Sequence, residues 1–214
     1  MFKTLAIIAA MLLTPHIQTI DLALSNKVLT QSVLIKAKVF KMNDDLSIKY
    51  GMIGCSGTYV GPETVLTAAH CFSMPTTGIW VKDYKGKSHE AIVIKISPDL
   101  DLALLSVKGP YKHSVSKIAK EAPIGSKLIS VGSPLGFEFL LSEGIVAATH
   151  YKDRTFKATY LIHTGMINSG SSGGGAFDGS GDLVGVNTMT VGSPFGWAGI
   201  SMAVDLETIR GFLK

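Results

Sequence analysis

The residues of this chain that could do chemistry centre on a serine inside a glycine-rich run. Ile167 to Gly175 reads Ile-Asn-Ser-Gly-Ser-Ser-Gly-Gly-Gly, with four glycines and three serines. Glycine loses the most backbone freedom in a helix or strand, so the run predicts a shaped loop. Successive N–H groups in such a loop can converge beside a serine hydroxyl and stabilise an oxyanion where a nucleophile attacks. Taken alone, the run could equally be a flexible Gly/Ser linker.

Two upstream stretches favour the catalytic interpretation. His70 lies in Thr-Ala-Ala-His-Cys, and Asp101 heads the apolar run Leu-Ala-Leu-Leu. A serine hydroxyl needs a base to take its proton, and a carboxylate can hold the tautomer of an imidazole base. We therefore predict His70 as the general base, Asp101 as its acidic partner and Ser172 as the nucleophile. The backbone N–H groups of Gly170 and Ser172 are the predicted oxyanion-hole donors.

Neighbouring residues offer alternatives to these assignments. Ser171 adjoins Ser172, but only Ser172 is followed by Gly-Gly and preceded by glycine two residues earlier. Asp99 would point to the same face of a strand as Asp101, but only Asp101 opens the apolar run. The other histidines lack a partner motif and are interpreted as surface or core residues: His16, His89, His113, His150 and His163.

These motifs resemble those of the chymotrypsin-fold serine endopeptidases, in which the triad also follows the order His, Asp, Ser. Thr-Ala-Ala-His-Cys and Asp-Leu-Ala-Leu resemble the trypsin-like enzymes. The second half is more similar to the high-temperature-requirement (Deg-type) proteases, through Gly-Ser-Pro-Leu-Gly from Gly132, Glu-Gly-Ile-Val from Glu143 and Ile-Asn-x-Gly-x-Ser-Gly-Gly from Ile167. The expectation is therefore a protease of this type without the appended peptide-binding domain that Deg-type relatives usually carry.

The elements that must position these residues are short strands. From Val28 onward, β-rich runs alternate with turn residues such as Lys85-Gly86-Lys87, which predicts barrels rather than helices. The resemblance implies an all-β, chymotrypsin-like fold of two six-stranded antiparallel Greek-key barrels, over residues 26–115 and 116–204. Asp205 is the expected N-cap of a C-terminal helix over residues 205–214.

The expected strands fall into two sets of six. The first set is Ser32 to Phe40, Met52 to Val60, Val65 to Ala69, Ile79 to Tyr84, Ala91 to Ile96 and Leu102 to Val107. The second set is Lys127 to Val131, Gly144 to Thr149, Ala158 to Thr164, Gly175 to Asp178, Leu183 to Thr190 and Gly199 to Val204.

Substrate-binding residues follow from position relative to Ser172. Met166 and Ile167 are expected at the base of the primary pocket, and Asn187, Thr188 and Met189 along one wall. None of them is acidic. An unpaired cation would be costly to bury there, so the pocket predicts uncharged small or medium apolar P1 side chains.

The N-terminus predicts export. One cation, Lys3, precedes nine apolar residues from Leu5 to Leu13, whereas a membrane span needs about 20. We interpret residues 1–25 as a signal peptide, with a small-x-small pattern at Ala23-Leu24-Ser25, and expect no stable membrane span and a secreted or periplasmic location. An uncleaved anchor or an ordinary amphipathic segment is the alternative.

The two cysteines, Cys55 and Cys71, flank the stretch that ends at His70. The resemblance to trypsin-like enzymes implies a disulfide between them, a feature that Deg-type proteases generally lack. The alternative is two free thiols in a reducing compartment.

Composition narrows the class of function. The net charge is +4 and the lysines are scattered, which speaks against a nucleic-acid partner. The expected function is a serine endopeptidase acting on proteins or peptides, without a metal or an organic cofactor. An inactive binding module on the same fold, or an esterase using the same triad, is the alternative.

Overall fold

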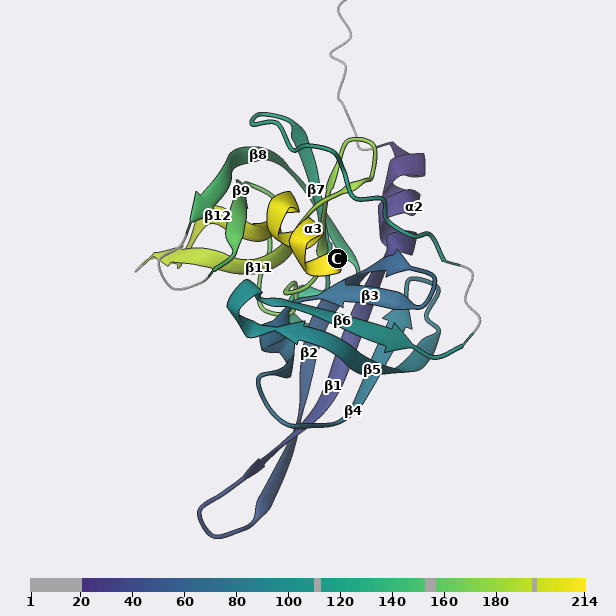
Figure 1. Cartoon of the computed structure of the whole chain (residues 1–214), viewed down its shortest axis with the longest axis vertical. Coiled ribbons are helices and arrows are strands. Elements are labelled where there is room, and N and C mark those ends of the chain that lie inside the picture. Colours follow the sequence, from purple (N-terminus) through teal and green to yellow (C-terminus); the bar gives the residue numbers. More distant parts are fainter. Residues whose placement is uncertain (1–20, 110–112, 153–156, 194–195) are drawn as a thin grey trace, which may run out of the picture.

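Two closed antiparallel barrels make up most of the molecule (Figure 1). The computed structural model describes residues 21–109, 113–152, 157–193 and 196–214, so most of the expected signal peptide lies outside the described residues. The first barrel has the strand order β1-β2-β3-β6-β5-β4 and the second β10-β11-β12-β9-β8-β7. The predicted pair of six-stranded barrels is thus confirmed.

The strands and the C-terminal helix follow the predicted order, and several strands are longer than predicted. The first barrel contains β1 (Ser32–Met42), β2 (Ile48–Gly61), β3 (Thr64–Thr67), β4 (Thr76–Asp83), β5 (Ser88–Ser97) and β6 (Leu102–Val107). The second contains β7 (Lys127–Gly132), β8 (Leu140–Lys152), β9 (Thr159–His163), β10 (Gly175–Asp178), β11 (Leu183–Ser193) and β12 (Gly196–Asp205). The helix α3 (Leu206–Leu213) ends the chain.

Turn and cap residues act as their chemistry predicts. Gly86 has a φ of 85° in the turn between β4 and β5, a backbone conformation that glycine adopts without strain. Asp205 caps α3, where its carboxylate accepts a 3.1 Å hydrogen bond from the N–H of Thr208. The extended β1–β2 hairpin projects away from the first barrel (Figure 1).

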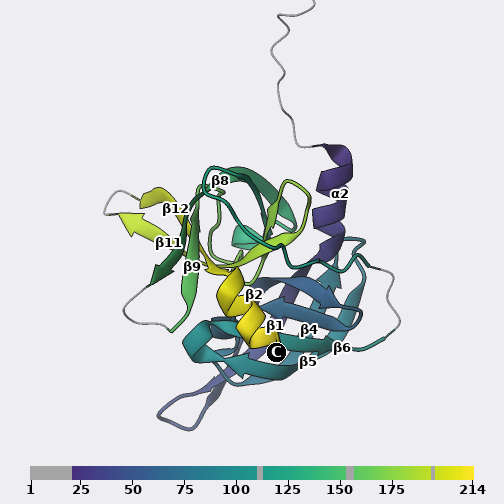
Figure 2. The ribbon, with the colours of Figure 1, turned by 45° about the horizontal axis from the view of Figure 1, so that its top comes forward.

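A helix precedes the first strand. α2 (Leu22–Gln31) begins at the N-cap Asp21, whose side chain accepts a hydrogen bond from the N–H of Ala23. The prediction of β structure from Val28 onward is therefore wrong up to Gln31. The small-x-small pattern at Ala23-Leu24-Ser25 lies within this helix. The helix α2 leads into β1 of the first barrel (Figure 2). It also contacts the second barrel, because Lys27 forms an ion pair of 3.0 Å with Asp182.

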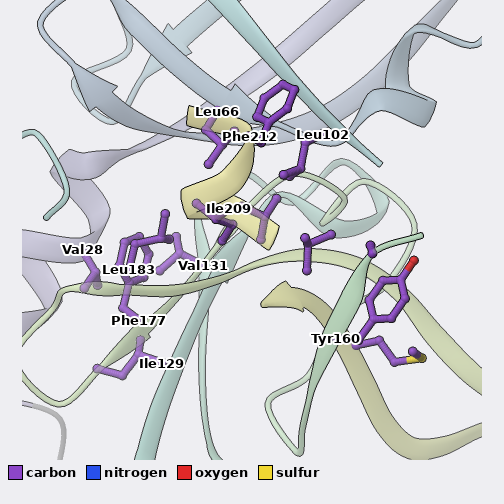
Figure 3. Packing of buried hydrophobic residues seen from close by; sticks show 14 residues of the cluster. Val28, Leu66, Leu102, Ile129, Val131, Tyr160, Phe177, Leu183, Ile209 and Phe212 are labelled. Atoms are coloured by element: carbon purple, nitrogen blue, oxygen red, sulfur yellow. The ribbon is translucent and has the colours of Figure 1, made fainter. Parts of the chain in front are cut away.

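One hydrophobic cluster joins the two barrels and both helices (Figure 3). Leu66 and Leu102 come from the first barrel, Phe177 and Leu183 from the second. Phe212 of α3 belongs to the same cluster and lies beside the first-barrel leucines in Figure 3. Because this shared core fixes one barrel against the other, loops from both can form one site.

Among the described helices, none has the length and apolar character that crossing a bilayer requires.

Candidate active site

His70 and Asp101 lie on short helical turns that follow or precede barrel strands. His70 belongs to η1 (Ala69–Phe72), directly after β3, and Asp101 follows η2 (Pro98–Leu100), directly before β6. Asp101 has a φ of 51°, in the left-handed region that aspartate tolerates better than most residues. Both turns therefore deliver their side chains at the edge of the first barrel.

The imidazole of His70 and the carboxylate of Asp101 are in direct contact. His70 Nδ1 lies 3.0 Å from Asp101 Oδ1 and 2.9 Å from Oδ2. The backbone N–H of His70 donates to Oδ1 at 3.0 Å, and the hydroxyl of Thr188 donates to Oδ2. A carboxylate only accepts hydrogen bonds, so Nδ1 carries the proton of the neutral ring and Nε2 is left as the basic atom.

Asp101 is 6% exposed. Burial alone would raise the pKa of its carboxyl, but the hydrogen bonds and charge of His70 and the Thr188 hydroxyl outweigh it and lower the pKa. The carboxylate therefore stays ionised at neutral pH. An ionised partner also stabilises an imidazolium at His70, which is the charge that a general base develops.

Ser172 lies close to this pair but points elsewhere. Its Oγ donates a 3.3 Å hydrogen bond to the carbonyl of Thr188. Within the described part of the chain, no hydrogen bond joins Ser172 to the ring of His70. The backbones are adjacent, because a side chain at Gly173 would overlap Thr67 and Ala68, the residues that lead into η1. A rotation about the Cα–Cβ bond of Ser172 would release its hydroxyl from Thr188.

The loop before Ser172 leaves two N–H groups without an acceptor. The carbonyl of Ser169 accepts from the N–H of Leu135 at 2.8 Å, and the carbonyl of Ser171 accepts from Gly174 at 2.9 Å. Within the described residues, the N–H groups of Gly170 and Ser172 donate no hydrogen bond. Gly170 has a φ of 99°, and a Cβ there would lie 2.6 Å from the carbonyl oxygen of Ser133. Only glycine fits this turn.

The side chains of the two alternative residues interact with other groups. Ser171 is buried, and its Oγ accepts a hydrogen bond from the N–H of Asn168. Asp99 lies on η2, where it forms an exposed ion pair of 2.7 Å with Lys157. The expectation that Asp99 shares a strand face with Asp101 is wrong, because the left-handed turn at Asp101 separates the two carboxylates.

The predicted pocket residues have varied surroundings. Met166 is exposed and Ile167 is buried. Asn187 is fully buried, with Oδ1 at 3.1 Å from His163 Nε2 and Nδ2 donating to Ser130 Oγ at 2.9 Å. Burial lowers the pKa of His163 to about 4, although the bond to Asn187 opposes the shift. Asn187 is thus held by a neutral histidine.

Thr188 and Met189 border a largely apolar hollow beside His70. Thr188 has no ladder partner on β12, because the register shifts between Asn187 and Met189. Such a bulge re-aims a side chain, here toward Asp101. The hollow is lined by Ala69, His70, Phe72, Ser73, Ile96, Pro98, Asp101, Thr188 and Met189. It can receive part of an apolar ligand next to the imidazole.

A disulfide links Cys55 of β2 to Cys71 of η1, with Cα atoms 6.3 Å apart. The residue after Cys55 is Ser56, which the sequence offers no reason to select. Its Oγ donates to the carbonyl of Gly170 at 2.8 Å. Sequence reasoning also did not single out Leu135, whose N–H donates to the carbonyl of Ser169. Its φ of 54° could not be foreseen from residue type. The only sequence signal near it is the Gly-Ser-Pro-Leu-Gly motif.

Two antiparallel barrels with a histidine, an aspartate and a serine at their junction define a chymotrypsin-like protein. The chain belongs to the trypsin-like peptidase domain family. The sequence pattern of this family matches residues 55–186, which is more than half of the chain.

Proteases of the HtrA and Deg type are similar in sequence. Serine protease HTRA4 of Mus musculus is 30% identical over 157 residues, which cover 70% of this chain and 31% of that protein. A protein of Ectopseudomonas mendocina (strain ymp), named as a probable periplasmic serine endoprotease DegP-like, is 34% identical over 121 residues, which cover 55% of this chain and 25% of that protein. The chain thus spans about a third or less of these relatives.

Solved structures share the fold. The HtrA-type protease AlgW with a decapeptide has a TM-score of 0.77 and 19% sequence identity, over 89% of this chain and 65% of that one. At this identity, the likeness concerns the fold alone.

Proposed function

We propose that this chain is a serine endopeptidase that cleaves peptide bonds through an acyl-enzyme at Ser172. The observation that carries the proposal is the contact between His70 and the buried Asp101, next to a loop in which the N–H groups of Gly170 and Ser172 have no acceptor among the described residues. In this proposal, a base (His70), a nucleophile (Ser172) and an anion-binding turn lie together where the two barrels meet.

In the first half of the reaction, Nε2 of His70 takes the proton of Ser172 as Oγ attacks the peptide carbonyl carbon. The carbonyl oxygen becomes an oxyanion and accepts hydrogen bonds from the N–H groups of Gly170 and Ser172. Asp101 stays ionised and stabilises the imidazolium. The C–N bond then breaks as His70 gives its proton to the leaving amine, which leaves an ester at Ser172.

In the second half, His70 takes a proton from a water molecule that attacks the ester carbonyl. The same two N–H groups stabilise the second oxyanion, and the C–O bond to Ser172 breaks as the hydroxyl regains its proton. Every step uses only residues of this chain and water.

Before the first step, the Ser172 hydroxyl exchanges its hydrogen bond with Thr188 for one with His70. The hydrogen bond from Ser172 Oγ to the neutral carbonyl of Thr188, 3.3 Å long, is lost. The hydrogen bond that replaces it has the imidazole of His70 as its acceptor. Staggered positions of a serine side chain interconvert readily, so this movement adds little to the barrier.

The substrates we propose are proteins and peptides with uncharged small or medium apolar P1 side chains. None of the predicted pocket residues is charged, and the side chain of Asn187 is occupied by His163 and Ser130. The apolar hollow beside His70 extends the surface available to a substrate.

We also propose a secreted or periplasmic location. The disulfide between Cys55 and Cys71 suits an oxidising compartment, and one relative is named as periplasmic.

The test is digestion of denatured casein and of a peptide library by the purified chain, with mass spectrometry of the products. We expect internal cuts after uncharged small or medium residues, and none by Ser172→Ala. The matched control is Ser180→Ala, an exposed serine in the turn after β10, which should cut like the parent. Hydrolysis of p-nitrophenyl esters without any peptide cleavage would assign an esterase instead, and no hydrolysis of either would leave a binding module.

A further inference from the structure

We infer that Ser56 is a positioning residue that holds the oxyanion-binding loop in shape from the opposite barrel. Ser56 belongs to β2 of the first barrel, whereas the loop belongs to the second. The inference rests on the proposed function, because the loop it concerns is the one that would bind the oxyanion.

Ser56 makes three hydrogen bonds to the segments that surround Ser172. Its Oγ donates to the carbonyl of Gly170 at 2.8 Å and accepts from the N–H of Ser133 at 2.9 Å. Its own N–H donates to the carbonyl of Ser172 at 2.8 Å. The side chain is 2% exposed, so water does not replace these bonds easily.

Four consecutive peptide groups, from Ser169 to Gly173, show what these bonds do. The first group joins Ser169 to Gly170 and the third joins Ser171 to Ser172. In both, the carbonyl accepts a hydrogen bond, but the N–H has no acceptor among the described residues. The second group joins Gly170 to Ser171 and the fourth joins Ser172 to Gly173. In both, the N–H and the carbonyl are hydrogen-bonded, and Ser56 is the donor to each carbonyl. The N–H groups that could bind an oxyanion therefore alternate with peptide groups that Ser56 fixes.

The loop needs such external ties because its own residues set few conformational preferences. Glycine populates many backbone conformations, and Gly170 and Gly173 have φ angles of 99° and 84°. A change in ψ of Gly170 that is not compensated at Ser171 would rotate the N–H of Gly170 relative to that of Ser172. Fixing the Gly170 carbonyl restrains this dihedral angle and with it the relative direction of the two N–H groups, and oxyanion stabilisation requires donors held in a fixed arrangement.

Ser56 also links this loop to the base. Cys55, its neighbour in sequence, is bonded to Cys71, the neighbour of His70. The position of Ser56 is thereby fixed relative to the imidazole. One strand segment of the first barrel therefore sets the distance between the base and the oxyanion-binding turn.

The test compares Ser56→Ala with the parent chain in the kinetics of peptide hydrolysis. We expect kcat to fall roughly 10- to 100-fold with KM within about twofold, less than the roughly 10²- to 10³-fold that follows loss of an oxyanion donor itself. A peptide boronic acid, which binds as a tetrahedral anion, should lose affinity by the same factor as kcat.

Ser32→Ala is the matched control. Ser32 is also 2% exposed, lies in the same barrel and donates from Oγ to a backbone carbonyl, that of Val28, at 2.7 Å. It should lose stability without the losses in kcat and boronate affinity. If Ser56→Ala behaves like Ser32→Ala, the inference is wrong. If the parent has no turnover, the proposed function fails and this inference fails with it.

Amide hydrogen exchange of the parent provides a measurement that needs no variant. The N–H of Ser133 should exchange as slowly as those of the barrel strands, since Ser56 accepts its hydrogen bond. The N–H of Gly170 should exchange much faster. Fast exchange at Ser133 would show that the tie through Ser56 does not persist in solution, and would overturn the inference.

Discussion

The two barrels contribute to the site in different ways. The first supplies His70 and Asp101, whose side chains are already 2.9 Å apart and lie beside a disulfide. The second supplies Ser172 on a loop of glycines and serines that is held by bonds to other segments. The proposed acid and base are therefore preorganised mainly within their own barrel, with one hydrogen bond from Thr188 of the second barrel, while the proposed nucleophile depends on its neighbours.

The first barrel therefore provides a fixed pair of side chains, and the second provides a side chain that must move. A charge that develops on the imidazole meets a fixed carboxylate, so no reorganisation is needed when the proton moves. In the proposed reaction, by contrast, the Ser172 hydroxyl must first rotate away from Thr188. Apart from Ser172 itself, the contrast predicts that variants on the first-barrel side affect activity most strongly, and that stability and activity can be separated elsewhere.

The largest effect is expected from Asp101→Asn. The amide keeps the shape of the carboxylate but can present an N–H to Nδ1 of His70, which would favour the wrong tautomer. We expect kcat for peptide hydrolysis to fall on the order of 10⁴-fold, as in the Ser-His-Asp template. Asp99→Asn is the matched control, because Asp99 contacts Lys157 at the surface. Equal losses in the two variants would contradict the assignment of Asp101.

A smaller effect is expected from Thr188→Val, which removes the hydroxyl that donates to Asp101. A hydrogen bond to a charged group contributes about 1.5 to 3 kcal/mol, so kcat should fall about 10- to 100-fold. Thr190→Val, at an exposed position of the same strand, serves as the control. A Thr188 variant with parental kcat would show that the second-barrel contact does not orient the carboxylate.

Loss of the disulfide should act mainly on stability. The Cys55–Cys71 bridge closes a loop with a sequence separation of 16, and its removal should lower the free energy of unfolding by about 3 kcal/mol. Urea unfolding of the parent with and without a reductant measures this loss. The double variant Cys55→Ala/Cys71→Ala should have the same free energy of unfolding as the reduced parent, with or without reductant. If reductant leaves the parent unchanged, the bridge does not stabilise the first barrel.

At neutral pH the smallest effect is that of His163 in the second barrel, which changes stability only in acid. His163 has a pKa of about 4 in the folded state against 6.5 for an unperturbed side chain. Because the unfolded chain binds the proton more readily, the free energy of unfolding should fall as pH decreases from about 6.5 to about 4, by up to about 3 kcal/mol from this group. His163→Gln removes the titration, so urea unfolding across this range should show a shallower pH dependence than for the parent. Identical slopes would mean that His163 is not held neutral.

Local patterns predicted much of the fold because barrel strands leave a local signature. Short apolar runs and turn residues such as Gly86 set the order of the strands, and Asp205 marked the start of α3. The helix α2 was missed, because its apolar residues continue the pattern interpreted as an export signal. Its contacts with the second barrel, such as that of Lys27 with Asp182, are invisible in sequence.

The candidate site shows the same limit. The surroundings of His70, Asp101 and Ser172 are local motifs, so these residues can be selected from the amino-acid sequence alone. Ser56 and Gly170 are separated by 114 positions, and no local pattern reports a contact that depends on packing between two barrels. The role of Thr188 beside Asp101 depends on a register shift in β11, which residue types did not predict.

The central claim is that His70 activates Ser172 as a nucleophile. The most direct measurement is reaction of the purified chain with a fluorophosphonate probe, followed by peptide mapping of the adduct. The claim predicts a single adduct on Ser172 in the parent, a strongly slowed reaction in His70→Ala and no adduct in Ser172→Ala. An adduct on Ser171, or equal labelling of the parent and Ser172→Ala, would contradict it.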